Sequence, residues 1–137
     1  MRAVPMALLL GLLAACGDRG GTSPPQEAVF EVRACIGSSA APQGEVFRIL
    51  LENSTQIQTA AALLATGSTH VVAGTPRVGD GGFNAPWTWH LDPASVGFPD
   101  VTAEVCEGCP HDIESNLNYW LSLGCFAPIG VVIARDR

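Results

Sequence analysis

The chain contains no lysine, so all seven of its positive side chains are arginines. Thirteen acidic residues outnumber them and give a formal net charge of -6 at pH 7. No run of arginines forms the basic stripe that neutralises nucleic-acid phosphates. We therefore expect no nucleic-acid partner.

A long apolar run is also missing, since a membrane-spanning helix needs about 20 residues. The apolar segment Ala3 to Leu13 follows Arg2 and leads into Ala14-Ala15-Cys16. This order is typical of a secretory signal peptide over residues 1–15, and its end resembles the lipobox of bacterial lipoproteins. The resemblance implies cleavage before Cys16 by signal peptidase II and a diacylglycerol on Cys16. We expect an exported protein whose membrane partner is reached through this lipid, at the periplasmic face or the cell surface.

The remaining chain divides into a tether and one domain. Residues 16–27 contain too few apolar side chains to bury themselves, and we expect a flexible tether there. Residues 28–137 suffice for a single folded domain. This domain contains four cysteines, Cys35, Cys106, Cys109 and Cys125. An even number in an exported chain predicts two disulfides, and the sequence pattern leaves all three pairings open.

Periodicity predicts an alternation of strands and helices. Alternating apolar and polar residues indicate strands at 29–35 and 44–51. Asn53 and Gly67 are typical of the beginning and end of a helix, and Pro110 and Gly124 bound a second one. Further strands are predicted at 69–75, 87–91, 101–106 and 129–134. The expected fold is α+β, a mainly antiparallel, disulfide-stabilised sheet of about five or six strands with two helices on one face.

One stretch of the chain carries a family resemblance. Asn84-Ala85-Pro86-Trp87-Thr88-Trp89-His90-Leu91-Asp92-Pro93, followed by Glu104-Val105-Cys106, is similar to the N-terminal domain family named after an amoebal calmodulin-binding protein. The similarity covers about residues 45–134. It implies a Cys106–Cys125 disulfide, which leaves Cys35 to pair with Cys109. It brings no known activity, and calmodulin binding is not carried over because the chain has no basic amphipathic helix.

The same stretch offers a candidate ligand-binding surface, formed by Asn84, Trp87, Trp89, His90 and Asp92. Aromatic faces beside amide and carboxylate groups suit a small-molecule, glycan or protein ligand. However, Trp87 and Trp89 share one face of a predicted strand, and Asp92-Pro93 is a common way to open a turn. Core and turn roles for these residues are the favoured interpretation.

The cysteines suggest two further hypotheses. Cys106-Glu107-Gly108-Cys109 stands before a predicted helix, where a redox-active thiolate is stabilised. Only 28 residues follow Cys109, too few to complete a thioredoxin-like fold. Cys106, Cys109, His111 and Cys125 are ligand types that zinc prefers, but their spacing is unusual for a zinc site.

We therefore expect no metal and no cofactor. Nor does the sequence contain a recognisable constellation of catalytic nucleophile and base. The predicted function is a non-catalytic binding or interaction module on a bacterial envelope. The alternative is an envelope thiol-disulfide oxidoreductase that uses the Cys106–Cys109 pair.

Overall fold

The computed structural model describes residues 26–136. The predicted signal peptide and the lipidation site Cys16 lie outside the described residues. Within the described part of the chain, no helix is both long and apolar enough to cross a membrane.

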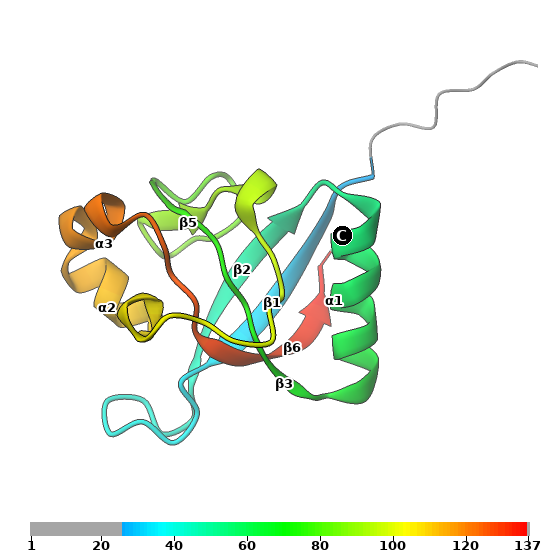
Figure 1. Ribbon diagram of the computed structural model, residues 1–137, viewed down its shortest axis with the longest axis horizontal. Coiled ribbons are helices and arrows are strands. Elements are labelled where there is room, and N and C mark those ends of the chain that lie inside the picture. Colours follow the sequence, from blue (N-terminus) through cyan, green and yellow to red (C-terminus); the bar gives the residue numbers. More distant parts are fainter. Residues whose placement is uncertain (1–25, 137) are drawn as a thin grey trace, which may run out of the picture.

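A four-stranded antiparallel sheet forms the centre of the domain (Figure 1). Its strands are β1 (Ala28–Ala34), β2 (Glu45–Leu51), β3 (Thr69–Val71) and β6 (Ile129–Arg135), in the order β2-β1-β6-β3. All seven residues of β1 pair with β2. The C-terminal strand β6 lies between β1 and β3, so the last segment of the chain joins the first and middle parts of the sheet.

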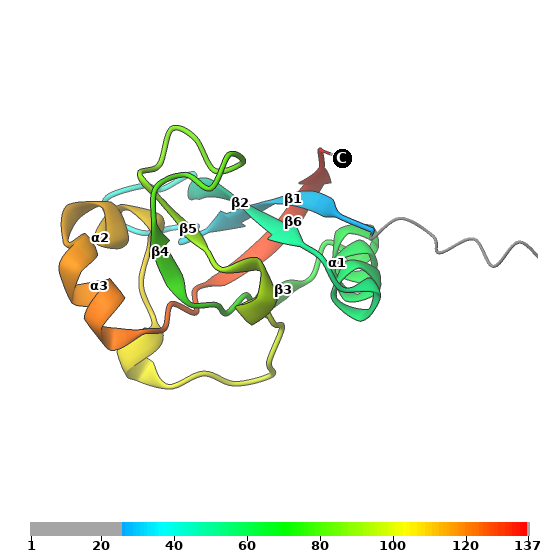
Figure 2. The same cartoon turned by 90° about the horizontal axis from the view of Figure 1, so that it is seen from above.

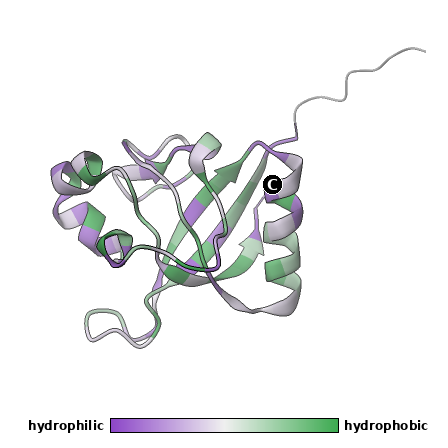
Figure 3. Ribbon diagram, viewed as in Figure 1, coloured by the Kyte–Doolittle hydropathy of each residue, from purple (hydrophilic) through white to green (hydrophobic). Residues whose placement is uncertain are grey.

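The alternation in β1 and β2 decides which face of the sheet is buried. Phe30 and Val32 are paired with Ile49 and Phe47, and all four side chains are buried in the core. Glu31 lies between them in the sequence and is paired with Arg48 on the opposite, partly exposed face. Figure 3 shows hydrophobic residues concentrated along these strands.

Helix α1 (Ser54–Thr66) packs against β6 and β2 at one end of the sheet. The side chain of Asn53 accepts hydrogen bonds from the backbone N–H groups of Thr55 and Gln56, which would otherwise lack partners at the start of the helix. Gly67 ends the helix with a φ of 62°, a left-handed conformation that favours glycine. Both predicted boundaries of this helix are confirmed.

The second half of the chain adds a small sheet and two short helices. Strands β4 (Pro76–Val78) and β5 (Trp89–Leu91) form a separate antiparallel pair. Helices α2 (Pro110–Ser115) and α3 (Leu117–Leu123) follow. Figure 2 shows α2 and α3 at the end of the domain opposite to α1, with β4 and β5 between them.

Three local predictions were wrong, although the α+β class with antiparallel sheets is confirmed. Residues 101–106 form no strand: Val101 is 80% exposed and unpaired, and Glu104–Cys106 is the 3-10 turn η2. The strand predicted at 69–75 ends at Val71, because the chain crosses from the main sheet to the small one before β4. The predicted second helix is two helices, since Asn116 has a non-helical φ of -146°.

Candidate functional site

Two disulfides cross-link the part of the domain around α2 and α3. Cys35, directly after β1, is bonded to Cys109, directly before α2. Cys106 in η2 is bonded to Cys125, just after α3. This is the pairing that the family resemblance implied, and the structure confirms it.

The pairing separates the two cysteines of the Cys106-Glu107-Gly108-Cys109 motif. Each is bonded to a distant partner, so the motif does not form the local disulfide that the redox hypothesis requires. The proposed zinc ligands Cys106, Cys109 and Cys125 are likewise disulfide sulfurs, and zinc binds thiolates.

The sulfurs of Cys35 and Cys109 lie near a carboxylate. One oxygen of Glu45 and the two sulfur atoms all lie within 4.8 Å of one another. The disulfide bond removes both thiolates, so this geometry does not make a metal centre.

A groove of about 360 Å³ opens beside the Cys35–Cys109 disulfide. Its lining comes from four separate segments, which meet where β1 ends and β6 begins. The lining residues are Cys35, Ile36, Thr69, Glu107, Gly108, Cys109, Pro128, Ile129, Gly130 and Val131. The surface is predominantly apolar, with Glu107 as its only charged side chain.

Two isoleucines at the groove are unusually exposed. Ile36 is 58% exposed and Ile129 is 57% exposed. They are far apart in the sequence, and the fold brings both to the same hollow. Exposed apolar side chains that gather at one concave site are typical of a surface that contacts another molecule.

The wall of the groove is held in place by local contacts. Cys35 has a φ of 59°, a left-handed conformation that is uncommon for a residue with a side chain. Gly108 packs so closely on Trp120 that an added Cβ atom would lie 2.8 Å from the ring. The backbone N–H of Cys109 donates a 2.7 Å hydrogen bond to the carboxylate of Asp112. These contacts position the disulfide before any ligand arrives.

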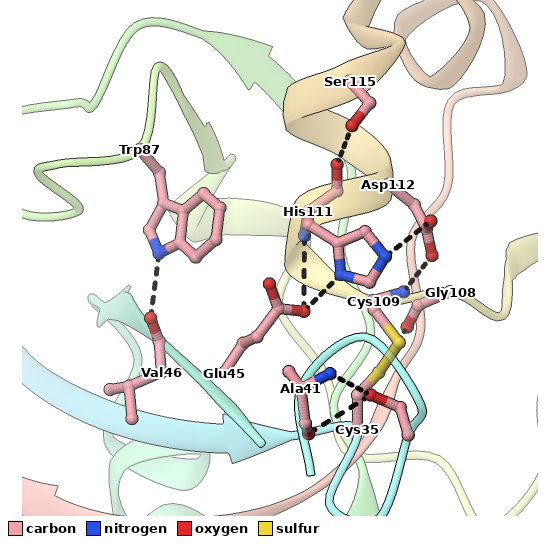
Figure 4. A network of polar contacts seen from close by, with 11 residues as sticks. Cys35, Ala41, Glu45, Val46, Trp87, Gly108, Cys109, His111, Asp112 and Ser115 are labelled. Atoms are coloured by element: carbon pink, nitrogen blue, oxygen red, sulfur yellow. Dashed lines mark hydrogen bonds and ion pairs between the residues drawn. A yellow bond between two sulfur atoms is a disulfide. The ribbon is translucent and has the colours of Figure 1, made fainter. Parts of the chain in front are cut away.

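Behind the disulfide, His111 lies between two carboxylates (Figure 4). Its Nδ1 atom is 2.7 Å from Oε2 of Glu45, and its Nε2 atom is 3.2 Å from Oδ1 of Asp112. The hydrogen bond to Glu45 raises the pKa of His111, partial burial opposes this, and the negative charges of Glu45 and Asp112 raise the pKa further. The protonated imidazole therefore links β2 to α2, next to the Cys35–Cys109 disulfide.

The residues proposed from the sequence as a ligand surface have structural contacts instead. Asn84 is fully buried: its Oδ1 accepts a hydrogen bond from the backbone N–H of Arg48, and its Nδ2 donates to the carbonyl of Trp89. The indole N–H of Trp87 donates to the carbonyl of Val46. Asn84 and Trp87 thus cover the outer edge of β2, whose backbone groups would otherwise be free to pair with another strand.

The other three members of that surface are equally engaged. Trp89 is 0% exposed and packs against Phe47, Phe126 and Trp87 in the core. Nδ1 of His90 lies 2.7 Å from the carbonyl oxygen of Gly79. Asp92 caps the 3-10 turn η1 (Pro93–Ser95) and forms an ion pair with Arg77. The five residues do not form one exposed surface, because Asn84 and Trp89 are inside the domain.

The groove was missed by the sequence analysis because its residues come from segments that only the tertiary structure brings together. Thr69 begins β3, and Glu107 and Ile129 lie in or beside segments that contribute nothing to a local motif. One signal was present, since Glu107 and Gly108 belong to the motif that had been considered for its cysteines.

The fold and its two cross-links define a small, disulfide-bonded α+β domain. The chain belongs to the N-terminal domain family named after the amoebal calmodulin-binding protein, whose family model matches residues 26–132. This match confirms the suspected family and extends further toward the N-terminus than the resemblance did, so that it includes β1 and Cys35. No curated protein and no solved structure matches the chain.

Proposed function

We propose that the protein is a non-catalytic binding module, anchored to a bacterial envelope through a lipid on Cys16, and that its ligand occupies the groove beside the Cys35–Cys109 disulfide. The observation that carries the binding role is the groove itself: a preformed, mostly apolar hollow with two exposed isoleucines. The lipobox-like sequence before Cys16 supports the anchor.

A binding role agrees with the chemistry of the lining. Its cysteine sulfurs are in a disulfide, and its remaining polar side chains are those of Thr69 and Glu107. His111, the nearest residue that could act as a base, is hydrogen-bonded to Glu45 and lies beside Asp112. No described residue therefore places an activated nucleophile in the groove.

The oxidoreductase alternative has less support. It needs Cys106 and Cys109 to exchange electrons as one pair, and these cysteines are bonded to Cys125 and Cys35.

Two experiments test the two parts of the proposal. For the anchor, cells expressing the wild type or Cys16→Ser are labelled with a fatty acid, and membrane and soluble fractions are compared. We expect label and membrane association only for the wild type. Equal behaviour of the two proteins would contradict the anchor.

For the groove, isopropanol serves as an apolar probe in a titration followed by backbone amide chemical shifts. We expect the largest shifts at Ile36, Thr69 and Ile129. Val78, which is 68% exposed but lies outside the groove, is the internal control. Shifts centred on Val78, or spread evenly over exposed apolar residues, would contradict a ligand site in the groove.

A further inference from the structure

The groove continues into a second hollow, of about 240 Å³, that shares Thr69 and Ile129 with it. This second hollow is also lined by His70, Val71 and Asp100. The side chain of Asp100 is fully exposed and lies 3.7 Å from Nε2 of His70. The two hollows together therefore form one channel with an acidic residue in each part, Glu107 in the first and Asp100 in the second.

No positive side chain balances these acids locally. Among the described residues no arginine lines either hollow, and the chain has no lysine. A carboxylate or phosphate ligand would therefore meet repulsion and no matching donor, whereas a cationic ligand would meet attraction.

The lining also distinguishes between neutral ligand classes. It contains no aromatic side chain on which a sugar ring could stack. It offers instead aliphatic side chains from Ile36, Ile129 and Val131, and exposed backbone beside Gly108. Such a surface suits an extended polypeptide, which supplies apolar side chains together with backbone hydrogen-bonding groups.

We infer that the channel binds an extended peptide segment of another protein, with an aliphatic side chain in the groove at Ile36 and Ile129 and a lysine or arginine beside Asp100 or Glu107. This inference rests on the proposed binding function and adds the class of ligand. The negative charge of the channel selects the peptide, and its apolar walls hold it.

The test selects peptides from a displayed library of random heptapeptides against the whole protein purified in detergent. The affinity of the enriched peptides is then measured by fluorescence polarisation for four proteins. They are the wild type, the double variant Asp100→Arg/Glu107→Arg, the control Glu27→Arg/Glu52→Arg with the same change in net charge, and Thr69→Trp, which fills the channel. All substituted side chains are exposed, and circular dichroism checks that each variant is folded.

We expect enriched peptides that combine aliphatic residues with lysine or arginine. Reversing both channel acids should weaken their binding about tenfold, because two exposed attractions become repulsions. The control variant should bind like the wild type, and Thr69→Trp should bind at least about tenfold more weakly.

Two results would overturn the inference. Neutral or acidic peptides that lose binding in Thr69→Trp would show that the groove binds ligands of another class, and the proposed function would stand. No enrichment, or peptides indifferent to Thr69→Trp, would reject the peptide ligand, and the isopropanol titration would then decide separately whether the groove binds apolar groups at all.

Discussion

The Oδ1 atom of Asn84 lies 2.7 Å from the backbone nitrogen of Arg48 and accepts its hydrogen bond across 36 positions of sequence. The same side chain donates to the carbonyl of Trp89, so one buried amide joins the edge of β2 to β5. A residue that looked like a ligand contact in the sequence thus holds the two sheets together.

Replacing Asn84 by alanine should destabilise the domain by about 2–3 kcal/mol, because the N–H of Arg48 and the carbonyl of Trp89 lose these partners and unsatisfied buried groups are costly. Urea unfolding followed by circular dichroism measures the loss. Asn118→Ala, at an exposed position of α3, is the matched control. A loss no greater than that of the control would contradict the role assigned to Asn84.

Trp87→Phe should cost about 1 kcal/mol, less than Asn84→Ala, because it removes one hydrogen bond. Phenylalanine keeps a ring beside Trp89, whose centroid lies 5.9 Å from that of Trp87, but it cannot donate to the carbonyl of Val46. If Trp87 instead served mainly as a ligand contact, the free energy of unfolding would not change. Urea unfolding again provides the measurement.

The two disulfides should contribute unequally to stability. Cys35–Cys109 joins residues 74 positions apart, and Cys106–Cys125 joins residues 19 apart. In the chain-entropy account the longer loop contributes about 1 kcal/mol more. We therefore expect Cys35→Ala/Cys109→Ala to unfold at a lower urea concentration than Cys106→Ala/Cys125→Ala. The opposite order would show that local packing, and not loop closure, determines the contribution.

The free energy of unfolding should also depend on the protonation of His111. Because the pKa of His111 is raised in the folded protein, its interaction with Glu45 is fully present below the unfolded pKa of about 6.5. The contribution is lost as the pH rises through the raised, folded-state pKa. Glu45→Gln should lower the folded-state pKa, and His111→Gln should remove this part of the pH dependence.

A proton NMR titration of the His111 ring, in the wild type and in Glu45→Gln, measures this directly. Thermal unfolding on either side of the transition, at about pH 5.5 and about pH 8.5, provides the second readout. An identical titration of the ring in both proteins would contradict the assigned ion pair.

Local patterns were sufficient to predict the parts of the fold whose stability depends on neighbours in sequence. Strand alternation located β1 and β2, and the residues Asn53 and Gly67 located the ends of α1. The false strand at 101–106 shows the limit of this approach. That segment has strand-like composition, but the fold gives it no partner strand, and its backbone turns at Glu104 instead.

The candidate site lay beyond local patterns for a similar reason. Trp87, Asn84 and Asp92 attracted attention because they are chemically capable and close in sequence, and the fold uses all three in its own contacts. Ile36 and Ile129 are unremarkable in the sequence. They become informative only when the Cys35–Cys109 disulfide and the pairing of β1 with β6 bring them to one exposed hollow.

The central claim is that the groove is the surface through which the protein contacts its partner. The most direct measurement is photo-crosslinking in intact cells, with a benzophenone amino acid at position 36 or, as a control, at position 78. We predict an adduct from position 36 whose crosslinked peptide contains aliphatic and basic residues, and which is lost in Asp100→Arg/Glu107→Arg. Adducts from position 78 alone, or none from position 36, would contradict the account.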